Sequence, residues 1–352
     1  MTTKPSPGGR QARVTLADVA AHVGVDPSVV SRVINGDPRL SVRPETRERV
    51  VAAIKQLRYR PNAAGRSLRT ARAGMLGLFI PDFANPVYAE IIKGAQAAAA
   101  TLGYVLVTGS ATGDKPGTRQ YIDLLGQGRV DGLLLAGTDT DKALIDRLND
   151  VAMPWLLVNR RASWARRCVI LDDERAGDLA VEHLAALGHR RIAHLAGPTG
   201  EDTALRRRAG YLAAMERNGL PHEDGLIVHA DYAHAGGAMA MAALLALDEP
   251  PTAVFVANVA SAIGALHAAH AAGVEVPRDL SVVAVHDLPL ASYLTPPLTT
   301  VRMPLEDLGR RAVELLAGSS PDDPIEEIVD DAVELIVRGS SARAPRRRGK
   351  KP

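Results

Sequence analysis

The sequence predicts an α/β protein in two parts, a small all-α head followed by a larger body built on parallel sheets. Residues 14–57 carry helical segments with capping signals. From Met75 onward, short apolar runs alternate with amphipathic segments instead. Alternation of this kind is typical of parallel strands whose sheet is covered by helices on both faces.

Charge divides the chain at the same place. Residues 1–73 hold 14 Lys+Arg against 5 Asp+Glu, residues 74–341 hold 22 against 35, and residues 342–352 add six basic residues. A basic head on an acidic body is typical of a nucleic-acid reader joined to a second domain. A basic, disordered terminus is the alternative, but most of the excess of the head lies between Arg32 and Arg72.

The cysteine content of the chain favours a reducing compartment. The single cysteine, Cys168, permits no internal disulfide. No apolar run is long enough to span a bilayer, and residues 1–13 lack the apolar core of a signal peptide. We therefore expect a cytoplasmic protein with no membrane partner.

The first head helix begins at a capping box. In Thr15-Leu16-Ala17-Asp18 the threonine oxygen can accept a hydrogen bond from the amide three residues on, and Val14 stands where a hydrophobic staple would put it. Gly24 ends the helix because glycine tolerates a left-handed backbone. Apolar residues at helical spacing predict its buried side: Leu16, Val19, Ala20 and Val23.

The second head helix carries the polar face of interest. Asp26 is a good N-cap and Pro27 a good first residue for a helix that runs to about Asn35. The face that carries hydrogen-bonding groups suits base edges and phosphates in a major groove, or it merely meets water. Spacing alone leaves both interpretations open. The apolar side holds Val30, Val33 and Ile34, and the polar side Ser28, Ser31, Arg32 and Asn35.

A third helix and a connecting segment complete the head. The helix begins at Pro44 and Glu45, and its predicted inner side carries Val50, Val51, Ile54 and Leu57. Residues 59–70 then have the composition of a polar linker between domains.

The body contains two series of predicted strands and helices, which indicates two similar lobes with a cleft between them at the carboxyl ends of the strands. The first series has the strands MLGLFI, YVLVT, GLLLA and WLLV with helices near 86–102, 117–127 and 141–150. The second has RIAHLA, LIVHA, AVFVA and SVVAV with helices near 173–187, 204–218, 235–247 and 259–272.

The body contains no pattern of an enzyme. A GxGxxG after the first strand, a Walker loop and a metal-spaced Cys/His cluster are all missing from the sequence. His183 and His189 fall within or just after a helix, so we expect them at the surface or at a cap. We therefore expect no catalytic residues, no cofactor and no metal.

The head resembles the opening of the lactose-repressor (LacI/GalR) family, through VTLADVAAHVGVDPSVVSRVING and above all its Val-Ser-Arg-Val. The resemblance implies a helix-turn-helix that reads operator DNA. It assigns groove and backbone contacts at the first helix, operator preference at the start of the second, and base or phosphate contacts along it. The implied DNA-binding residues are Thr15, Leu16, Pro27, Ser28, Ser31, Arg32 and Asn35, joined by Asn62 and Leu68 of the following stretch.

That following stretch matches the hinge of the family. There a short helix forms on the operator, paired with its dimer mate in the minor groove, and Leu68 matches the leucine that wedges between base pairs. Three departures stand out. Pro27 brings no hydrogen-bonding side chain, the GDPRLSVRPET loop is about two residues longer than usual, and Gly65 replaces the usual alanine, which costs helix propensity of about 1 kcal/mol.

The body resembles the effector domain of the same family, through IPDFANPVYAEIIKGAQ, RVDGLLL, LAVEHLAALGHRRIAHLAGP, PTAVFVAN and LTPPLTTVRMPLEDLGRRAVELL. The resemblance implies a two-lobed, periplasmic-binding-protein-like domain with three crossings between the lobes. It also implies the effector-binding residues Asp82, Tyr88, Asn159, Arg160, Thr203, Arg207, Tyr232, Asn258 and His286. Asp82 has the alternative role of capping the helix that follows it.

Two departures bear on the effector. Val259 stands after Asn258 where the family commonly has aspartate, and His286 replaces an aspartate just before Asp287. A histidine there could donate to a carboxylate, phosphate or carbonyl, with a charge that varies near neutral pH. The predicted effector is a sugar, with a sugar acid or a sugar phosphate as the alternatives.

Together these observations predict a transcriptional repressor, cytoplasmic and nucleoid-associated. It would be a homodimer or tetramer that binds double-stranded, palindromic operator DNA under allosteric control by a small molecule. A solute receptor and a cytosolic enzyme are the rival classes. The predicted segments are a disordered basic arm (1–13), a DNA-binding domain (14–61), a hinge (62–73), an effector-binding and dimerisation domain (74–339) and a disordered basic tail (340–352).

Overall fold

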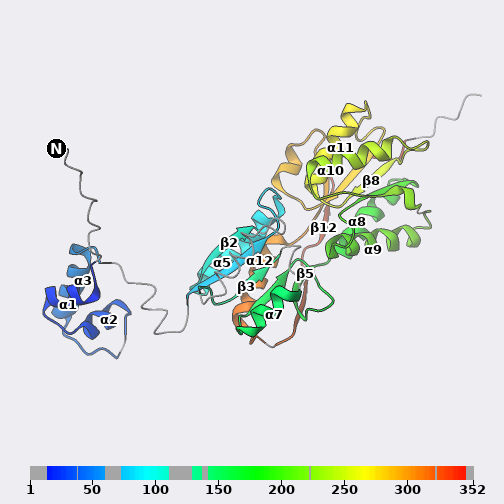
Figure 1. The fold of residues 1–352 in the computed structure, drawn as a ribbon. Helices are drawn as coiled ribbons and strands as arrows, with labels where there is room; N and C mark the ends of the chain where they lie inside the picture. The colour runs from blue at the N-terminus through cyan, green and yellow to red at the C-terminus, as the bar shows by residue number, and fades with distance from the viewer. Residues whose placement is uncertain are drawn as a thin grey trace, which may run out of the picture. The chain divides into compact units, whose positions relative to one another are not determined.

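The computed structural model describes residues 14–37, 39–59, 73–110, 129–136, 142–221, 223–321 and 323–345. The chain divides into two compact units, Met1–Ala73 and Gly74–Pro352 (Figure 1). The expected helix near 117–127, the arm 1–13 and the predicted hinge residues Asn62 and Leu68 lie outside the described residues. No helix of the described segments is long and apolar enough to cross a membrane.

The head is a bundle of three helices, α1 (Leu16–Val23), α2 (Pro27–Ile34) and α3 (Pro44–Gln56). Its predicted capping signals are confirmed. Thr15 and Asp18 form both bonds of the capping box, and Gly24 ends α1 at φ +73°. The carboxylate of Asp26 accepts from the Ser28 amide at the start of α2, where Pro27 is the first residue.

The apolar faces of the three helices form one small core. Val19, Val30 and Val50 are fully buried in it. The expectation for Val51 is wrong, since this side chain is 42% exposed and Ala53 lies inside instead. Each residue turns about 100° around a helix, so Val50 and Ala53 share a face that Val51 leaves.

The first lobe of the body is a six-stranded sheet in the order β11-β5-β4-β3-β1-β2, and every neighbouring pair is parallel. Helices α5 (Val87–Thr101), α7 (Lys142–Asp150) and α12 (Leu305–Gly318) belong to this lobe. Its strands are β1 (Met75–Ile80), β2 (Val105–Ser110), β3 (Leu133–Leu135), β4 (Trp155–Val158), β5 (Arg167–Leu171) and β11 (Ile325–Val329).

The second lobe is a sheet in the order β12-β10-β9-β8-β6-β7, parallel except where β12 pairs with β10. Helices α8 (Asp173–Ala186), α9 (Asp202–Arg217), α10 (His234–Leu245) and α11 (Val259–Ala271) cover it, with 3₁₀ turns η1 (Asp224–Leu226) and η2 (Pro289–Tyr293). Its strands are β6 (Ile192–Ala196), β7 (Ile227–His229), β8 (Ala253–Val256), β9 (Ser281–Val285), β10 (Thr299–Arg302) and β12 (Glu334–Ile336).

The chain crosses between the lobes three times. It passes from β5 into α8, from β10 into α12, and from β11 into β12. This number agrees with the crossings that the resemblance implies. The predicted two-lobed α/β fold is thereby confirmed, with the carboxyl ends of strands from both sheets bordering one cleft.

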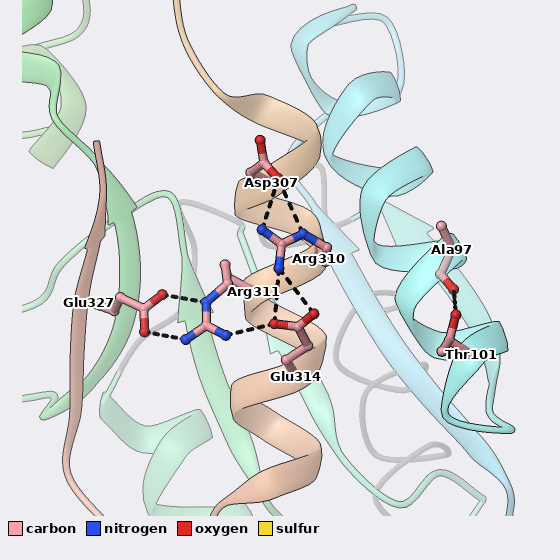
Figure 2. Close-up of polar contacts among 7 residues, drawn as sticks. All are labelled: Ala97, Thr101, Asp307, Arg310, Arg311, Glu314 and Glu327. Carbon is pink, nitrogen blue, oxygen red and sulfur yellow. Dashed lines mark hydrogen bonds and ion pairs between the residues drawn. The ribbon is translucent and has the colours of Figure 1, made fainter. Parts of the chain in front are cut away.

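The last lobe-one helix, α12, is held from two sides. Against α5 the contact is so close that a Cβ at Gly94 would overlap the carbonyl group of Glu306, and one at Gly309 would overlap that of Ile91. On the other side, Arg311 donates to both carboxylate oxygens of Glu327 on β11, at 2.7 and 2.8 Å (Figure 2). The helix therefore ties the sheet edge at β11 to the helical layer.

The predicted disordered tail, residues 340–352, is wrong for residues 340–345. Ser340 is fully buried, and its hydroxyl donates to the Val282 carbonyl at 2.6 Å. His189, expected at the surface or a cap, is also buried, and it bonds Ser281 at 3.0 Å and the Ala342 carbonyl at 3.0 Å. Residues 340–345 thus belong to the second lobe, because buried polar groups of that lobe need them as partners.

Candidate nucleic-acid interface and ligand cleft

The polar side of α2 faces solvent. Pro27, Ser28, Arg32 and Asn35 are exposed, and Ser31 is half-buried. The Asn35 side-chain amide donates to the Ser31 carbonyl at 2.6 Å and so ends the helix. Arg32 lies 3.5 Å from Asp37, a weak and exposed ion pair that leaves the guanidinium accessible.

The start of α1 offers a different kind of surface. Thr15 is exposed, but its hydroxyl and amide already bond Asp18 at 2.8 Å each. Leu16 is half-buried against the head core. These two residues are therefore placed by the fold of the head, and the exposed polar side chains of Ser28, Arg32 and Asn35 lie on α2.

A cavity of about 300 Å³ lies between the lobes of the body. All nine predicted effector residues line it, namely Asp82, Tyr88, Asn159, Arg160, Thr203, Arg207, Tyr232, Asn258 and His286. They follow strands of both sheets or lie in the first turns of α5 and α9, which agrees with a cleft at the carboxyl ends of the strands. Its size falls in the range of small-molecule sites.

Three polar lining residues were missed by the sequence reasoning. Asn85, Glu201 and Asp231 also line the cavity. Each lies in a loop, within three residues of a predicted effector-binding residue. Their positions next to Thr203 and Tyr232 or before α5 are the signal that could have found them.

Arg207 is buried and held by three partners. Its Nε donates to Asp173 at 2.7 Å, Nη1 to the Ala257 carbonyl at 2.7 Å, and Nη2 to Nε2 of His286 at 3.3 Å. Asp173 is fully buried and balances the charge. The guanidinium is thus fixed in direction before any ligand arrives.

His286 differs from what the sequence suggested. Burial, with the charge of Arg207 as a second cause, lowers the pKa of His286 well below its ordinary value of about 6.5. The expectation that its charge varies near neutral pH is therefore wrong. A neutral ring whose Nε2 accepts from Arg207 carries its proton on Nδ1, and that buried atom has no hydrogen-bond partner in the described part of the chain.

The aromatic wall is built by Tyr88 and Tyr232. The Tyr232 hydroxyl bonds Thr203 at 2.9 Å, and Arg207 lies 5.9 Å from the ring centroid. Burial raises the pKa of both tyrosines, so both hydroxyls stay protonated and can donate. A Cβ at Gly197 would overlap the Tyr232 ring, which shows how closely that ring lies against the end of β6.

Asn258 and Asp82 already have structural partners. Asn258 caps α11 by accepting from the Ser261 amide at 2.8 Å, and its Nδ2 donates to the Tyr232 carbonyl at 3.1 Å. Asp82 accepts from the Ala84 amide at 2.9 Å within the loop. The alternative in which Asp82 caps the next helix is wrong, since Pro86 occupies the N-cap of α5.

The cavity is lined by more carboxylates than guanidinium groups. Three carboxylates, from Asp82, Glu201 and Asp231, face two guanidinium groups, and Asp173 already pairs with one of these. In the described part of the chain, no group of three or more His, Cys, Asp or Glu side chains could hold a metal ion. The arrangement suits binding of a polar, uncharged molecule.

Comparisons with known proteins agree with this architecture. Residues 15–62 match the bacterial regulatory proteins of the lacI family, and residues 181–341 match a periplasmic binding protein-like domain. The ribose operon repressor of Escherichia coli (strain K12) is 38% identical over 308 residues, which cover 86% of this chain and 92% of that protein.

Solved structures extend the agreement to both units. A Lac repressor dimer bound to operator and an anti-inducer matches with a TM-score of 0.84 at 29% identity, over 94% of this chain and 100% of that one. A LacI family regulator from Enterococcus faecium with bound ribose matches with a TM-score of 0.68 at 25% identity, over 76% of this chain and 99% of that one. The chain therefore belongs to the LacI family of bacterial transcriptional regulators, which are DNA-binding proteins and not enzymes.

Proposed function

We propose that this regulator is a cytoplasmic, nucleoid-associated repressor that binds a palindromic operator as a homodimer, and that a small neutral sugar in the cleft changes its affinity for that operator. The observation that carries the proposal is the cavity between the lobes, where Arg207 is fixed beside two tyrosines. Aromatic faces and fixed hydrogen-bonding groups are the usual means of holding a sugar ring.

The charge of the cleft favours a neutral effector over a sugar acid or a sugar phosphate. An anion would enter beside Asp82, Glu201 and Asp231, and Arg207 already has the Asp173 carboxylate as its counter-ion. A neutral hydroxyl can instead accept from the remaining N–H groups of Arg207 and donate to a carboxylate. The ribose in the Enterococcus faecium relative makes D-ribose the first compound to test.

A thermal-shift series tests the effector. D-ribose and other neutral pentoses and hexoses are compared with ribonate and ribose 5-phosphate on the full chain. We expect a neutral sugar to raise Tm and the two anions to have little effect. Arg207→Ala should lose the response, whereas Arg217→Ala, which removes an exposed arginine from the same helix, should keep it. A response that survives Arg207→Ala would remove Arg207 from the site.

Selection of operators from random DNA tests the head. We expect enrichment of an inverted repeat, and loss of affinity in Arg32→Ala that is similar for all sequences and lowers the salt slope by about one. Lys55→Ala removes an exposed cation from α3 and serves as the control. Equal salt slopes for wild type and Arg32→Ala would remove Arg32 from the phosphate contacts.

The segment 62–73 is proposed to act as the hinge, with Asn62 and Leu68 contacting DNA. Glycine disfavours a helix by about 1 kcal/mol relative to alanine, so Gly65→Ala should tighten operator binding several-fold. Hydrogen exchange of this segment should slow when operator is added. Strong protection without DNA would contradict a hinge that orders on the operator.

A further inference from the structure

The first turns of α9 present two different faces. Glu201, Thr203 and Arg207 line the cavity, whereas Asp202 and Arg206 do not. The latter two are four residues apart and bond each other, with Arg206 Nε 3.0 Å and Nη2 2.9 Å from Asp202 Oδ2. Both side chains are largely buried, with 19% and 8% exposure. Buried polar groups are normally hydrogen-bonded, so we expect the other partners of Asp202 and Arg206 to lie outside the cavity.

Those partners belong to the other lobe. The carboxylate of Asp202 accepts from the backbone amide of Arg161 at 2.9 Å, and Arg161 lies in the loop between β4 and β5 of the first sheet. Arg206 Nη1 donates to the carbonyl of Leu171 at 2.6 Å, where β5 ends and the chain crosses over. Two hydrogen bonds of this pair thus join a second-lobe helix to the first lobe.

The same pair is connected to the arginine of the cavity through one carboxylate. Asp173 begins α8, at the first crossing, and is fully buried. Its Oδ1 lies 2.7 Å from Arg207 Nε and its Oδ2 lies 2.5 Å from Arg206 Nη1. If Arg207 moves, either Asp173 and Arg206 move with it, or a buried charge loses its partner. The second outcome is costly.

We propose that Asp202, Arg206 and Asp173 form an interlobe latch that transmits effector contact at Arg207 to the relative position of the two lobes. The proposal rests on the proposed function, in which the cleft holds the effector. These three are positioning residues, since none of them lines the cavity. The latch holds the loop after β4 against α9, and the engaged or disengaged state of its two interlobe bonds distinguishes two lobe arrangements.

Asp202→Ala tests the latch without touching the lining of the cavity. The matched control is Asp178→Ala, because Asp178 also bonds two arginines, Arg175 and Arg217, with 16% exposure, but entirely within the second lobe. Asp202→Asn is the milder variant, as it keeps an acceptor for the Arg161 amide and removes the charge facing Arg206.

The first measurement needs no effector. Spin labels are placed on exposed sites of the two lobes, Val151→Cys in the first and Met239→Cys in the second. Cys168 stays in place, because burial shields its thiol and raises its pKa. We expect electron–electron distance measurements to show a second, longer population in Asp202→Ala but not in Asp178→Ala. Identical distance distributions in all three proteins would overturn the latch.

The second measurement uses operator DNA and D-ribose, or whichever neutral sugar raises Tm. We expect Asp202→Ala to reduce the effect of the sugar on operator affinity by about tenfold while sugar affinity changes far less. Full coupling in Asp202→Ala would also overturn the latch. If no sugar changes the operator affinity of wild type, the proposed function fails instead, and the distance measurement still decides on the latch.

Discussion

At the scale of single residues, the cleft depends on groups whose charge and direction are set before a ligand binds. Arg207 is oriented by Asp173, Ala257 and His286 at once. Because His286 is neutral, it can accept from a permanent cation and leave one N–H for another partner. An aspartate in its place, as the resemblance implies for the family, would be a second anion close to Arg207.

The protonation state of His286 is a direct prediction. At about pH 6, below the ordinary imidazole pKa of about 6.5, we expect His286 to remain neutral with its proton on Nδ1. Nitrogen chemical shifts of histidine-labelled protein report this, and His286→Gln identifies the signal. A ring that carries both protons at that pH would contradict the assignment.

At the scale of elements, neighbouring helices approach each other at glycines. A Cβ at Gly177 on α8 would overlap the Arg207 carbonyl, and one at Gly210 on α9 would overlap that of Glu174. The same relation joins Gly94 on α5 and Gly309 on α12. The close contact of α8 with α9 brings Asp173 within reach of two arginines, so the glycines help to build the cleft.

Two alanine substitutions on α12 separate the effect of close helix packing from that of helix propensity. Gly309→Ala should destabilise the body by about 1–3 kcal/mol, because the new methyl group meets the backbone of α5. Gly318→Ala, where nothing lies within 4 Å, should be neutral or stabilise by up to about 1 kcal/mol. Urea unfolding of the two variants measures the difference. Equal free energies of unfolding for Gly309→Ala and Gly318→Ala would show that the close approach of α5 and α12 at Gly309 does not contribute to stability.

The predictability of elements from sequence followed their hydrophobic pattern. Capped head helices and uniformly apolar strands such as β1 and β9 were predicted because their signals are local. The strands β5, β11 and β12 were not, because they carry charged side chains whose partners lie elsewhere in the fold. The Arg167 guanidinium on β5 donates to the Trp155 carbonyl, whereas Glu327 on β11 and Glu334 on β12 form ion pairs with arginines. All nine predicted cleft residues gathered in one cavity, but Asp173, Asp202 and Arg206 depend on contacts between segments that no local pattern reveals.

At the scale of the whole molecule, several histidines are buried in the second lobe of the body. His194 is fully buried between the rings of Tyr211 and Phe255, at centroid distances of 5.1 and 4.6 Å. Its Nδ1 donates to the Phe255 carbonyl at 3.1 Å. Burial lowers the pKa of His194 to about 3, and burial also lowers the pKa values of His183 and His189.

These histidines make the stability of the body depend on pH in a stated direction. In the unfolded chain an imidazole binds a proton below about pH 6.5, whereas folded His194 does so only near pH 3. Between these values the unfolded state holds more protons, so stability is complete above pH 6.5 and falls as the pH is lowered. The slope contributed by His194 approaches about 1.4 kcal/mol per pH unit. Urea unfolding from pH 5 to 7.5 measures it, in a range above the titration of most carboxylates.

One substitution assigns that slope. His194→Phe keeps an aromatic ring between Tyr211 and Phe255 but cannot bind a proton, so it should lower the proton uptake on unfolding by about one between pH 5 and 6. It also removes the hydrogen bond that the ring donates to the Phe255 carbonyl, which should reduce stability by about 1 kcal/mol at every pH. His267→Phe replaces an exposed histidine and should keep the slope of wild type. An unchanged slope in His194→Phe would mean that other groups cause the loss of stability in acid, because the only proton that this variant removes is the one on the buried ring.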